Sequence, residues 1–480
     1  MDVEVLHHGG AVQVGSERLR LKDLLGPDRL QGGGLRIKGA RLAEHSLWLA
    51  LSDGTEHQVP LPPAKTTDRL ATLIVRNIGQ LLTMQGEGGV GLVAHAAVVC
   101  CREHVLEVVP DRDALSAVAL APGCRVVDAC GGVVSPGLVD PHTHPVFGGE
   151  RSVEFGLKAA GRSYLEIHKA GGGILSTVRS TRAATFDQLA RSCGANLTRL
   201  LAWGVTTCEG KSGYDLTLEG ELRLLEVLRT AGDCHPVDLH ATLLGAHTLP
   251  PEYIDEREAY VELVAGQMVP RAAAEGLCRF CDAYCEDGAF TPEEVERIFR
   301  AAQAAGLGLR LHAEQFTDQH GTELAVALGA ASADHLEAVG AAAIEALAGS
   351  RTTAVLLPGA ALACRCPWPP ARALLDAGVP VALGTDLNPG SSMTSSLPLM
   401  MSLACMQLGM TCEESWRAVT CVAAASLGLG DQIGRVAAGL QADLVIFDAP
   451  DYRYIPYHYA DNHARVVIKR GRVVLERQRD

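Results

Sequence analysis

Eight short apolar segments recur through the middle of this chain, and a stretch with helical features follows each of them. The segments are Val133–Val139, Val205–Cys208, Val237–Thr242, Arg279–Cys285, Leu307–His312, Ala333–Leu336, Thr353–Leu357 and Val379–Gly384. Short apolar runs are typical of buried parallel strands, and their alternation with helices indicates an α/β fold. We therefore predict a (β/α)8 barrel, a fold whose functional residues lie at the carboxyl ends of its strands.

The intervening segments carry helix start signals. The clearest is Thr291-Pro292-Glu293-Glu294. Thr291 can cap the first turn, proline suits the first helical position, and Glu294 can complete a capping box. We predict a helix that begins directly after Thr291.

Strand-rich segments flank the barrel on both sides. Short strands with turns between them run from Leu73 to His142, and two more occur near the carboxyl terminus in ADLVIFDAP and ARVVIKRGRVVLE. We predict a small β-sandwich domain built from residues 67–132 and 435–480, with the barrel at 133–434. Residues 1–66 form an amino-terminal β-rich extension of unknown role, in which alternating leucines such as Leu47, Leu49 and Leu51 indicate short strands.

Charge and composition restrict the partners. The formal net charge is −14, which disfavours nucleic acid and anionic membrane surfaces and favours a small-molecule substrate. The uncharged stretch 387–412 contains Asn388-Pro389 and Pro398, so we do not expect it to span a membrane. The fifteen cysteines have no regular disulfide-like spacing, and the first residues are not those of a signal peptide. We expect a cytoplasmic protein with reduced thiols.

Metal-ligating residue types occur where the predicted strands end. His142 and His144 follow the first strand, and residues two apart in extended chain point the same way. His312, His335 and Asp386 follow the fifth, sixth and eighth strands. Imidazole and carboxylate ligands that leave one position open for water are what a hydrolytic Zn²⁺ or iron site requires. The pattern therefore predicts a catalytic metal site.

Longer motifs resemble one family. They are PGLVDPHTHPVFGGER (136–151), YLEIHKAGGGILSTVRSTR (164–182), EGKSGYDL (209–216), LGAH (244–247), LHAEQ (311–315), DHLE (334–337), LGTDLNPGS (383–391) and IPYH (455–458). Together they resemble the imidazolonepropionases of the amidohydrolase superfamily over about residues 70 to 475. This resemblance implies metal-dependent hydrolysis of a ring C–N bond, in which 4-imidazolone-5-propanoate becomes N-formimino-L-glutamate during histidine degradation.

The resemblance also implies roles for individual positions. One Zn²⁺ or Fe³⁺ per chain is expected on His142, His144, His312 and Asp386. Asp386 is expected to take the water proton, and His335 to stabilise the oxyanion or relay a proton. The positions that match substrate contacts are Arg151, Tyr214, His247, Gln315, Asn388, Gly390 and Ser391. We further expect a homodimer.

These residue types suit such a substrate. An arginine and a phenol or hydroxyl can receive the propionate, and an imidazole with an amide can pair with the ring. Each also has an ordinary structural alternative. Arg151 could form a surface ion pair, Tyr214 could be a core aromatic, and His247 could be a hydrogen-bonded residue at a strand end. Residues 388–391 could serve only as a turn.

Two positions depart from the family pattern. Gln315 stands where some members have a glutamate that could shuttle protons, so we expect it to hydrogen-bond the substrate instead. Asp215 replaces the usual glycine in KSGYGL. Lys211 raises the possibility of a carboxylated lysine that bridges two metals, but a single metal fits its position beside KSGY better. The alternative functions are a related amidohydrolase or deaminase acting on another cyclic amide or amidine, and a barrel scaffold without catalysis.

Overall fold

A computed structural model describes residues 70–478, except 115, 117 and 163–171, together with strands within residues 3–60. The chain divides into two compact units, Met1–Leu70 and Ala71–Asp480. In the first unit, two three-stranded antiparallel sheets have the orders β1-β2-β3 and β4-β5-β6. Their strands are Val3–Val5, Ala11–Val14, Glu17–Arg20, Ile37–Ala43, Ser46–Leu51 and Glu56–Pro60.

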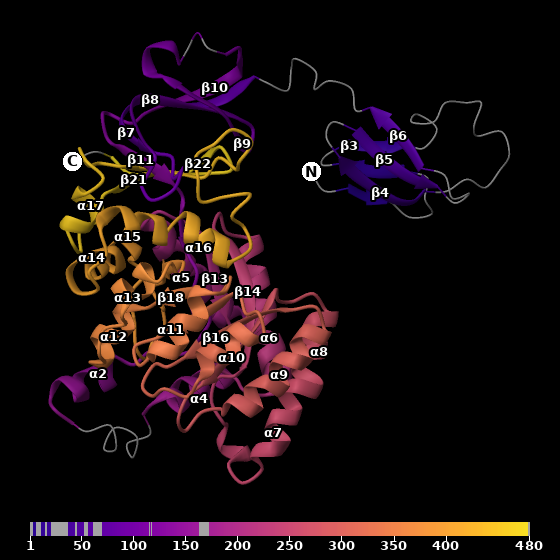
Figure 1. Cartoon of the computed structure of the whole chain (residues 1–480), viewed down its shortest axis with the longest axis vertical. Coiled ribbons are helices and arrows are strands. Elements are labelled where there is room, and N and C mark those ends of the chain that lie inside the picture. The colour runs from indigo at the N-terminus through magenta and orange to yellow at the C-terminus, as the bar shows by residue number, and fades with distance from the viewer. Residues whose placement is uncertain are drawn as a thin grey trace. The chain divides into compact units, whose positions relative to one another are not determined.

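The centre of the second unit is a parallel eight-stranded sheet with helices around it, as predicted (Figure 1). Its strands follow one another in sequence order: β12 (Leu138–Asp140), β13 (Val205–Lys211), β14 (Asp238–Ala246), β15 (Phe280–Cys285), β16 (Gly308–Ala313), β17 (Ser332–His335), β18 (Thr353–Leu356) and β19 (Val381–Leu383). Sequential order with one helix or more between neighbours is the arrangement of a (β/α)8 barrel.

The first and last barrel strands meet at their carboxyl ends. Thr143 and Leu387 form a parallel bridge. The Asp386 amide donates to the His142 carbonyl at 3.0 Å, and the His144 amide donates to the Leu387 carbonyl at 3.0 Å. The ring is thus joined between the very segments that carry the predicted metal ligands.

Helices cover the outside of the barrel. Three precede β13: α2 (Ser152–Ala159), α4 (Ile174–Ala183) and α5 (Phe186–Ala202). Those between later strands are α6 (Leu218–Asp233), α7 (Arg257–Leu263), α8 (Val269–Ala274), α9 (Pro292–Ala304), α10 (Gly321–Ala327), α11 (Ala341–Ala348), α12 (Pro358–Cys364) and α13 (Ala371–Asp376). After β19 come α14 (Leu397–Gln407), α15 (Cys412–Ala418), α16 (Cys421–Ser426) and the short α17 (Tyr454–Tyr457). Helix α9 begins after Thr291 with the predicted capping box, in which Thr291 and Glu294 bond reciprocally.

A second eight-stranded sheet combines both ends of this unit, which confirms the predicted β domain (Figure 1). Its order is β22-β21-β20-β11-β7-β8-β9, and β10 also pairs with β7. The strands are β7 (Ala71–Leu82), β8 (Leu92–Cys101), β9 (His104–Pro110), β10 (Leu120–Asp128), β11 (Val133–Pro136), β20 (Leu444–Phe447), β21 (Ala464–Lys469) and β22 (Arg472–Glu476). Apolar side chains such as Val75, Val98, Leu444 and Ile468 are fully buried in its core.

The predicted single strand Val133–Val139 is wrong, because two strands replace it. Residues Val133–Pro136 form β11 and pair with β20 and β7, whereas Leu138–Asp140 form the first barrel strand. Gly137 lies where the chain passes from one sheet to the other. Its amide donates to the Asp443 carbonyl at 2.8 Å, and a Cβ on it would lie 2.1 Å from Thr206 Oγ1. The chain can cross here only because this residue has no side chain.

This close approach generates a prediction about stability. Gly137→Ala should lower the free energy of unfolding by about 1–3 kcal/mol, because the new methyl group overpacks the contact with Thr206. Gly194→Ala is the matched control, since Gly194 lies inside α5 with nothing within 4 Å of the added Cβ. That change should raise stability by about 0.5–1 kcal/mol through helix propensity. Urea unfolding measures both, and equal effects of the two changes would contradict the proposed crowding at Gly137.

Candidate active site

Five buried side chains meet at the carboxyl ends of the barrel strands. His142 and His144 follow β12, His312 lies on β16, His335 ends β17, and Asp386 follows β19. Ligand atoms of His142, His144 and Asp386 lie within 4.8 Å of one another, as do those of His142, His312 and His335. The four predicted ligands therefore do not form one group by themselves. They belong to two overlapping triplets that share His142.

The donor set fits a metal ion. Within the described residues, His142 Nε2 is buried and has no hydrogen-bond partner, although Asp386 Oδ1 lies 3.5 Å away. His142 Nδ1 donates to Asp334 Oδ2 at 2.6 Å, which fixes the tautomer and leaves the Nε2 lone pair free. Burial, followed by the charge of Lys211, lowers the pKa of His142 well below its usual value. A neutral imidazole with a free lone pair is the form that binds a metal.

The pKa values of Asp386 and His335 are shifted in opposite directions. Burial opposes ionisation of Asp386, but the hydrogen bond and charge of His144 outweigh it and lower the pKa of the carboxyl group. Burial also opposes protonation of His335, but the charge of Glu337 outweighs it and raises the pKa of the imidazole. The pair therefore combines an ionised carboxylate, a possible base, with an imidazole that readily holds a proton.

A turn after β19 presents Asp386 to the histidines. Asp386 has φ 51°, a left-handed conformation that local hydrogen bonds support. Asn388 Oδ1 accepts from the amides of Gly390 and Ser391 at 2.7 and 2.8 Å, and the Ser391 hydroxyl donates to Asp386 Oδ2 at 3.1 Å. These bonds give Asn388 and Ser391 a turn function, which is the structural alternative considered for them.

Arg151 approaches this turn from the start of α2. A Cβ on Gly390 would lie 2.5 Å from Arg151 Nη1, so the guanidinium packs directly on the glycine. Arg151 Nη2 pairs with Glu154 Oε2 at 2.8 Å, and the same oxygen accepts from the Gly173 amide at 3.1 Å. The arginine side chain is 13% exposed, so this is not an ordinary surface ion pair. Gly173 belongs to the motif of residues 164–182, of which residues 164–171 lie outside the described part of the chain.

Aromatic and amide groups line the other side of the cluster. The His247 ring stacks on His144 with centroids 5.4 Å apart, and His247 Nδ1 bonds to the Gly213 carbonyl at 3.0 Å. Tyr214 lies 5.2 Å from His247 between ring centroids, and burial raises the pKa of its phenol. Gln315 accepts from the Tyr284 hydroxyl at 2.8 Å. Tyr214 and His247 therefore lie against the His144 ring, and Gln315 bonds to Tyr284, whose ring centroid lies 5.8 Å from that of His312.

Comparison with known proteins identifies the family. Residues 133–474 match the model of the amidohydrolase family. The chain is 48% identical to an imidazolonepropionase of Myxococcus xanthus over 412 residues, which cover 85% of this chain and 98% of that one. It is 46% identical to an imidazolonepropionase of Rubrobacter xylanophilus over 408 residues, with coverage of 83% and 98%.

The chain belongs to the imidazolonepropionases of the amidohydrolase family. Two solved structures share its fold at low identity. A zinc-bound adenosine deaminase from Xanthomonas campestris has a TM-score of 0.65 at 20% identity, covering 86% of this chain and 94% of its own. An N-isopropylammelide isopropylaminohydrolase from Burkholderia multivorans has a TM-score of 0.63 at 20% identity, with coverage of 84% and 98%. As an imidazolonepropionase, the chain is a metal-dependent hydrolase that acts on a small molecule. In the part of the chain that the structure describes, no helix has the length and apolarity to cross a membrane.

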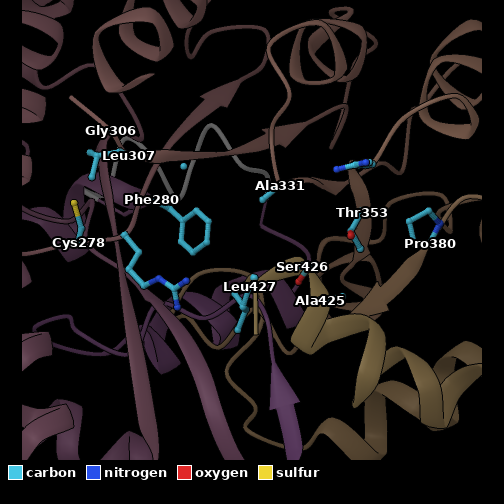
Figure 2. A pocket seen from close by; sticks show the side chains of 14 residues that line it. Cys278, Phe280, Gly306, Leu307, Ala331, Thr353, Pro380, Ala425, Ser426 and Leu427 are labelled. Carbon is cyan, nitrogen blue, oxygen red and sulfur yellow. The ribbon is translucent and has the colours of Figure 1, made fainter. Parts of the chain in front are cut away.

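A cavity lies at the opposite end of this imidazolonepropionase barrel. Its volume is about 680 Å³, and its lining includes Phe280, Gly308 and Thr353, the first residues of β15, β16 and β18. Figure 2 labels Phe280 and Thr353 among the side chains that line it. These are the amino ends of the strands. Because catalysis in such barrels takes place at the carboxyl ends, the histidine cluster and not this cavity marks the active site.

Sequence reasoning missed several site residues of this family member. Asp282 and Asp334 face His312 and His142, and Tyr284 bonds Gln315. The available signal was charge and a hydroxyl within otherwise apolar strands. Asp282 and Tyr284 are two residues apart on β15 and share a direction, as do Arg310 and His312 on β16. A polar residue that points inward from a buried strand was the clue.

Asp215 forms hydrogen bonds with three neighbouring side chains. Its carboxylate accepts from the Thr217 hydroxyl at 2.6 Å and from Arg223 Nη2 at 3.1 Å, and the Arg182 Nε donates to its carbonyl at 2.7 Å. Thr217 is the cap of α6. The carboxylate that replaces the family's glycine thus bonds to the cap residue of α6, which begins at Leu218.

The shared position of His142 generates a prediction. His142→Ala should reduce the amount of bound metal to less than about a tenth of the native value. The reason is that both ligand triplets lose a member, and one water molecule cannot take the place of the imidazole in both. His335→Ala is the matched control. It removes an equally buried imidazole of the cluster that belongs to one triplet only, and it should retain the ion. Elemental analysis after dialysis against a chelator measures both, and loss of metal in the His335 variant alone would contradict this ligand assignment.

Proposed function

We propose that this chain hydrolyses 4-imidazolone-5-propanoate to N-formimino-L-glutamate, with one Zn²⁺ or Fe³⁺ bound per chain. The observation that carries the proposal is the buried His142, His144, His312 and Asp386 cluster in a chain 48% identical to an imidazolonepropionase. Bound there, the ion would supply Lewis acidity, which makes water nucleophilic at neutral pH and polarises a carbonyl group.

The protein's own groups then account for the proton transfers. Asp386 accepts the proton of the attacking water as the new C–O bond forms at the ring carbonyl carbon. His335, whose pKa is raised, carries a proton that can stabilise the oxyanion or reach the nitrogen when the ring C–N bond breaks. The Ser391 hydroxyl holds one oxygen of Asp386 and so leaves the other directed toward the histidines.

Arg151 is proposed to receive the propionate of the substrate. Its Nε is buried and has no hydrogen-bond partner among the described residues, and its Nη1 packs against Gly390. A buried donor without a partner is costly, and a carboxylate would satisfy it with a charge-assisted bond. Tyr214 supplies a neutral hydroxyl beside His144, and His247 and Gln315 offer an imidazole and an amide for the ring.

The general test is turnover by purified, metal-replete protein. Loss of 4-imidazolone-5-propanoate, followed together with appearance of N-formimino-L-glutamate, should be fast and should stop when a chelator removes the ion. Elemental analysis of the active protein should give about one ion per chain. No turnover by metal-replete protein, or two ions in fully active protein, would refute the corresponding part of the proposal.

The binding role of Arg151 has its own test. Arg151→Met should lower kcat/KM at least about tenfold, because a charge-assisted bond contributes about 1.5–3 kcal/mol, and Tyr214→Phe should also weaken binding. Metal content should not change in either variant. Arg372→Met, which removes a guanidinium paired with Glu414 on α15, is the control and should keep kcat/KM. A value within twofold of the native one for Arg151→Met would show that another group receives the tail.

Gln315 separates two accounts of proton transfer. The Tyr284 hydroxyl donates to Gln315 Oε1, so the amide is oriented with its NH₂ group as a donor. Gln315→Ala should therefore raise KM and lower kcat modestly, whereas Asp386→Asn should abolish turnover. Gln315→Glu should not accelerate the reaction greatly. A hundredfold rise in kcat for Gln315→Glu would show that the native chain lacks its base and works on an easier substrate.

A further inference from the structure

A lysine is fully buried beneath the histidine cluster. Lys211 ends β13, and its ammonium group lies 2.7 Å from Glu209 Oε1, 2.7 Å from Asp282 Oδ2 and 3.6 Å from Asp334 Oδ2. These carboxylates are buried as completely as the lysine. Burying so many charges is costly unless each is paired, so the arrangement calls for an explanation beyond packing.

Two of the three carboxylates also face a histidine of the metal site. Asp334 Oδ2 accepts from His142 Nδ1 at 2.6 Å, and Asp282 Oδ2 lies 3.0 Å from His312 Nδ1. The lysine and the histidine approach the same oxygen in both cases. Lys211 therefore contacts two proposed ligands indirectly, each through one carboxylate. His142 follows β12, and His312 lies on β16.

Arg310, the other buried cation here, has a different set of partners. It lies 3.6 Å from Asp334 Oδ2 and 3.6 Å from Glu209 Oε1, and its guanidinium donates to the carbonyls of Pro141 and Ser426. Among the ion pairs of the described residues, only those of Lys211 include both Asp282 and Asp334. If Asp334 and Asp282 position the two histidines, Lys211 is the group that connects these two carboxylates.

We propose that Lys211 is a positioning residue that orients two metal ligands at once through Asp334 and Asp282. Carboxylates behind ligating histidines fix the tautomer and ring direction and raise ligand basicity. The ammonium pairs with both carboxylates and holds them in place, 2.6 Å from His142 Nδ1 for Asp334 and 3.0 Å from His312 Nδ1 for Asp282. Ligand atoms of these two histidines lie within 4.8 Å of each other. This inference rests on the metal site of the proposed function.

The same contacts argue against the alternative role of Lys211. A carboxylated lysine would bring a further negative charge among three carboxylates at 2.7 to 3.6 Å, with the loss of the cation that now balances them. The ammonium form is the one that these surroundings stabilise. A bridging ligand for a second metal ion is thereby disfavoured.

The experiment measures metal affinity, with activity as a second readout. Zn²⁺ dissociation constants are obtained by chelator competition for the native chain, Asp334→Asn, Lys211→Met and the double variant. Asp334→Asn should weaken Zn²⁺ binding about 10- to 100-fold. Lys211→Met should weaken it more, because both histidines are affected. The double variant should bind more tightly than the product of the single effects predicts, since both changes act through one contact.

Lys469→Met is the matched control. Lys469 is also a buried lysine between two carboxylates, with Nζ 2.7 Å from Asp238 Oδ2 and 2.7 Å from Asp443 Oδ2, but it belongs to β21 of the β domain. The Lys469→Met variant should unfold at a lower temperature or urea concentration, and its Zn²⁺ affinity should not change. Co²⁺ absorption adds a geometric readout, and Asp334→Asn should shift the visible bands whereas Lys469→Met should not. Asp334→Asn keeps the volume of the site and remains informative if Lys211→Met fails to fold.

The outcomes separate this inference from the proposed function. If the native chain binds no Zn²⁺ and does not turn over substrate, the proposed function fails. If the native chain binds Zn²⁺ but Asp334→Asn and Lys211→Met stay within twofold of it, the positioning role is refuted. It is refuted as well if Lys469→Met weakens binding equally, because the effect would then follow general stability, or if the single effects multiply fully in the double variant.

Discussion

The barrel is joined into a ring by backbone hydrogen bonds made beside the residues that are proposed to bind the metal. β12 and β19 are each three residues long, and the segments that follow them carry His142, His144 and Asp386. The Asp386 amide bonds the His142 carbonyl, and Asp140 accepts from the Thr385 amide and hydroxyl. Ligand geometry and barrel closure therefore depend on the same few peptide groups. An ion held there would stabilise the fold as well as catalyse a reaction, since it binds the native state and not the unfolded chain.

The buried charges below that seam follow from the same constraint. A parallel strand is enclosed on both faces, so any polar side chain that it directs inward must find a partner inside the barrel. Glu209 and Lys211 from β13, Asp282 from β15 and Asp334 from β17 are partners of this kind. Their pairing connects strands that are not neighbours. Burying so many charges costs more free energy than an apolar core would. The network is explained by its contacts with histidines that must remain polar for the chemistry.

Much of the fold was predictable because buried parallel strands consist of short runs of apolar residues. All eight barrel strands occur near their predicted positions. The error at Val133–Val139 has a local cause. Nothing in an unbroken apolar run marks the exchange of one sheet for another, and Gly137 is identified only by its contact with Thr206. β13 extends to Lys211, beyond the predicted Cys208, because charged residues that ordinarily end a strand are paired within the network. The ligand positions could be predicted from the strand ends. The pairing of Asp282 with His312 and of Asp334 with His142 could not, since these partners are distant in sequence.

Metal binding and substrate recognition are assigned to different parts of the architecture. The proposed ligands and the buried charge network lie on barrel strands and their immediate ends, whereas Arg151 directly precedes α2. Arg151 contacts Gly390 and Glu154, and Glu154 in turn accepts from the Gly173 amide. Rigid strands can hold an ion in one geometry, and connecting segments can vary without disturbing it. In this chain Arg151, the residue proposed to receive the propionate, contacts Gly390 directly and the Gly173 amide through Glu154. If that proposal holds, substrate preference depends on how these connecting segments meet and not on the barrel strands.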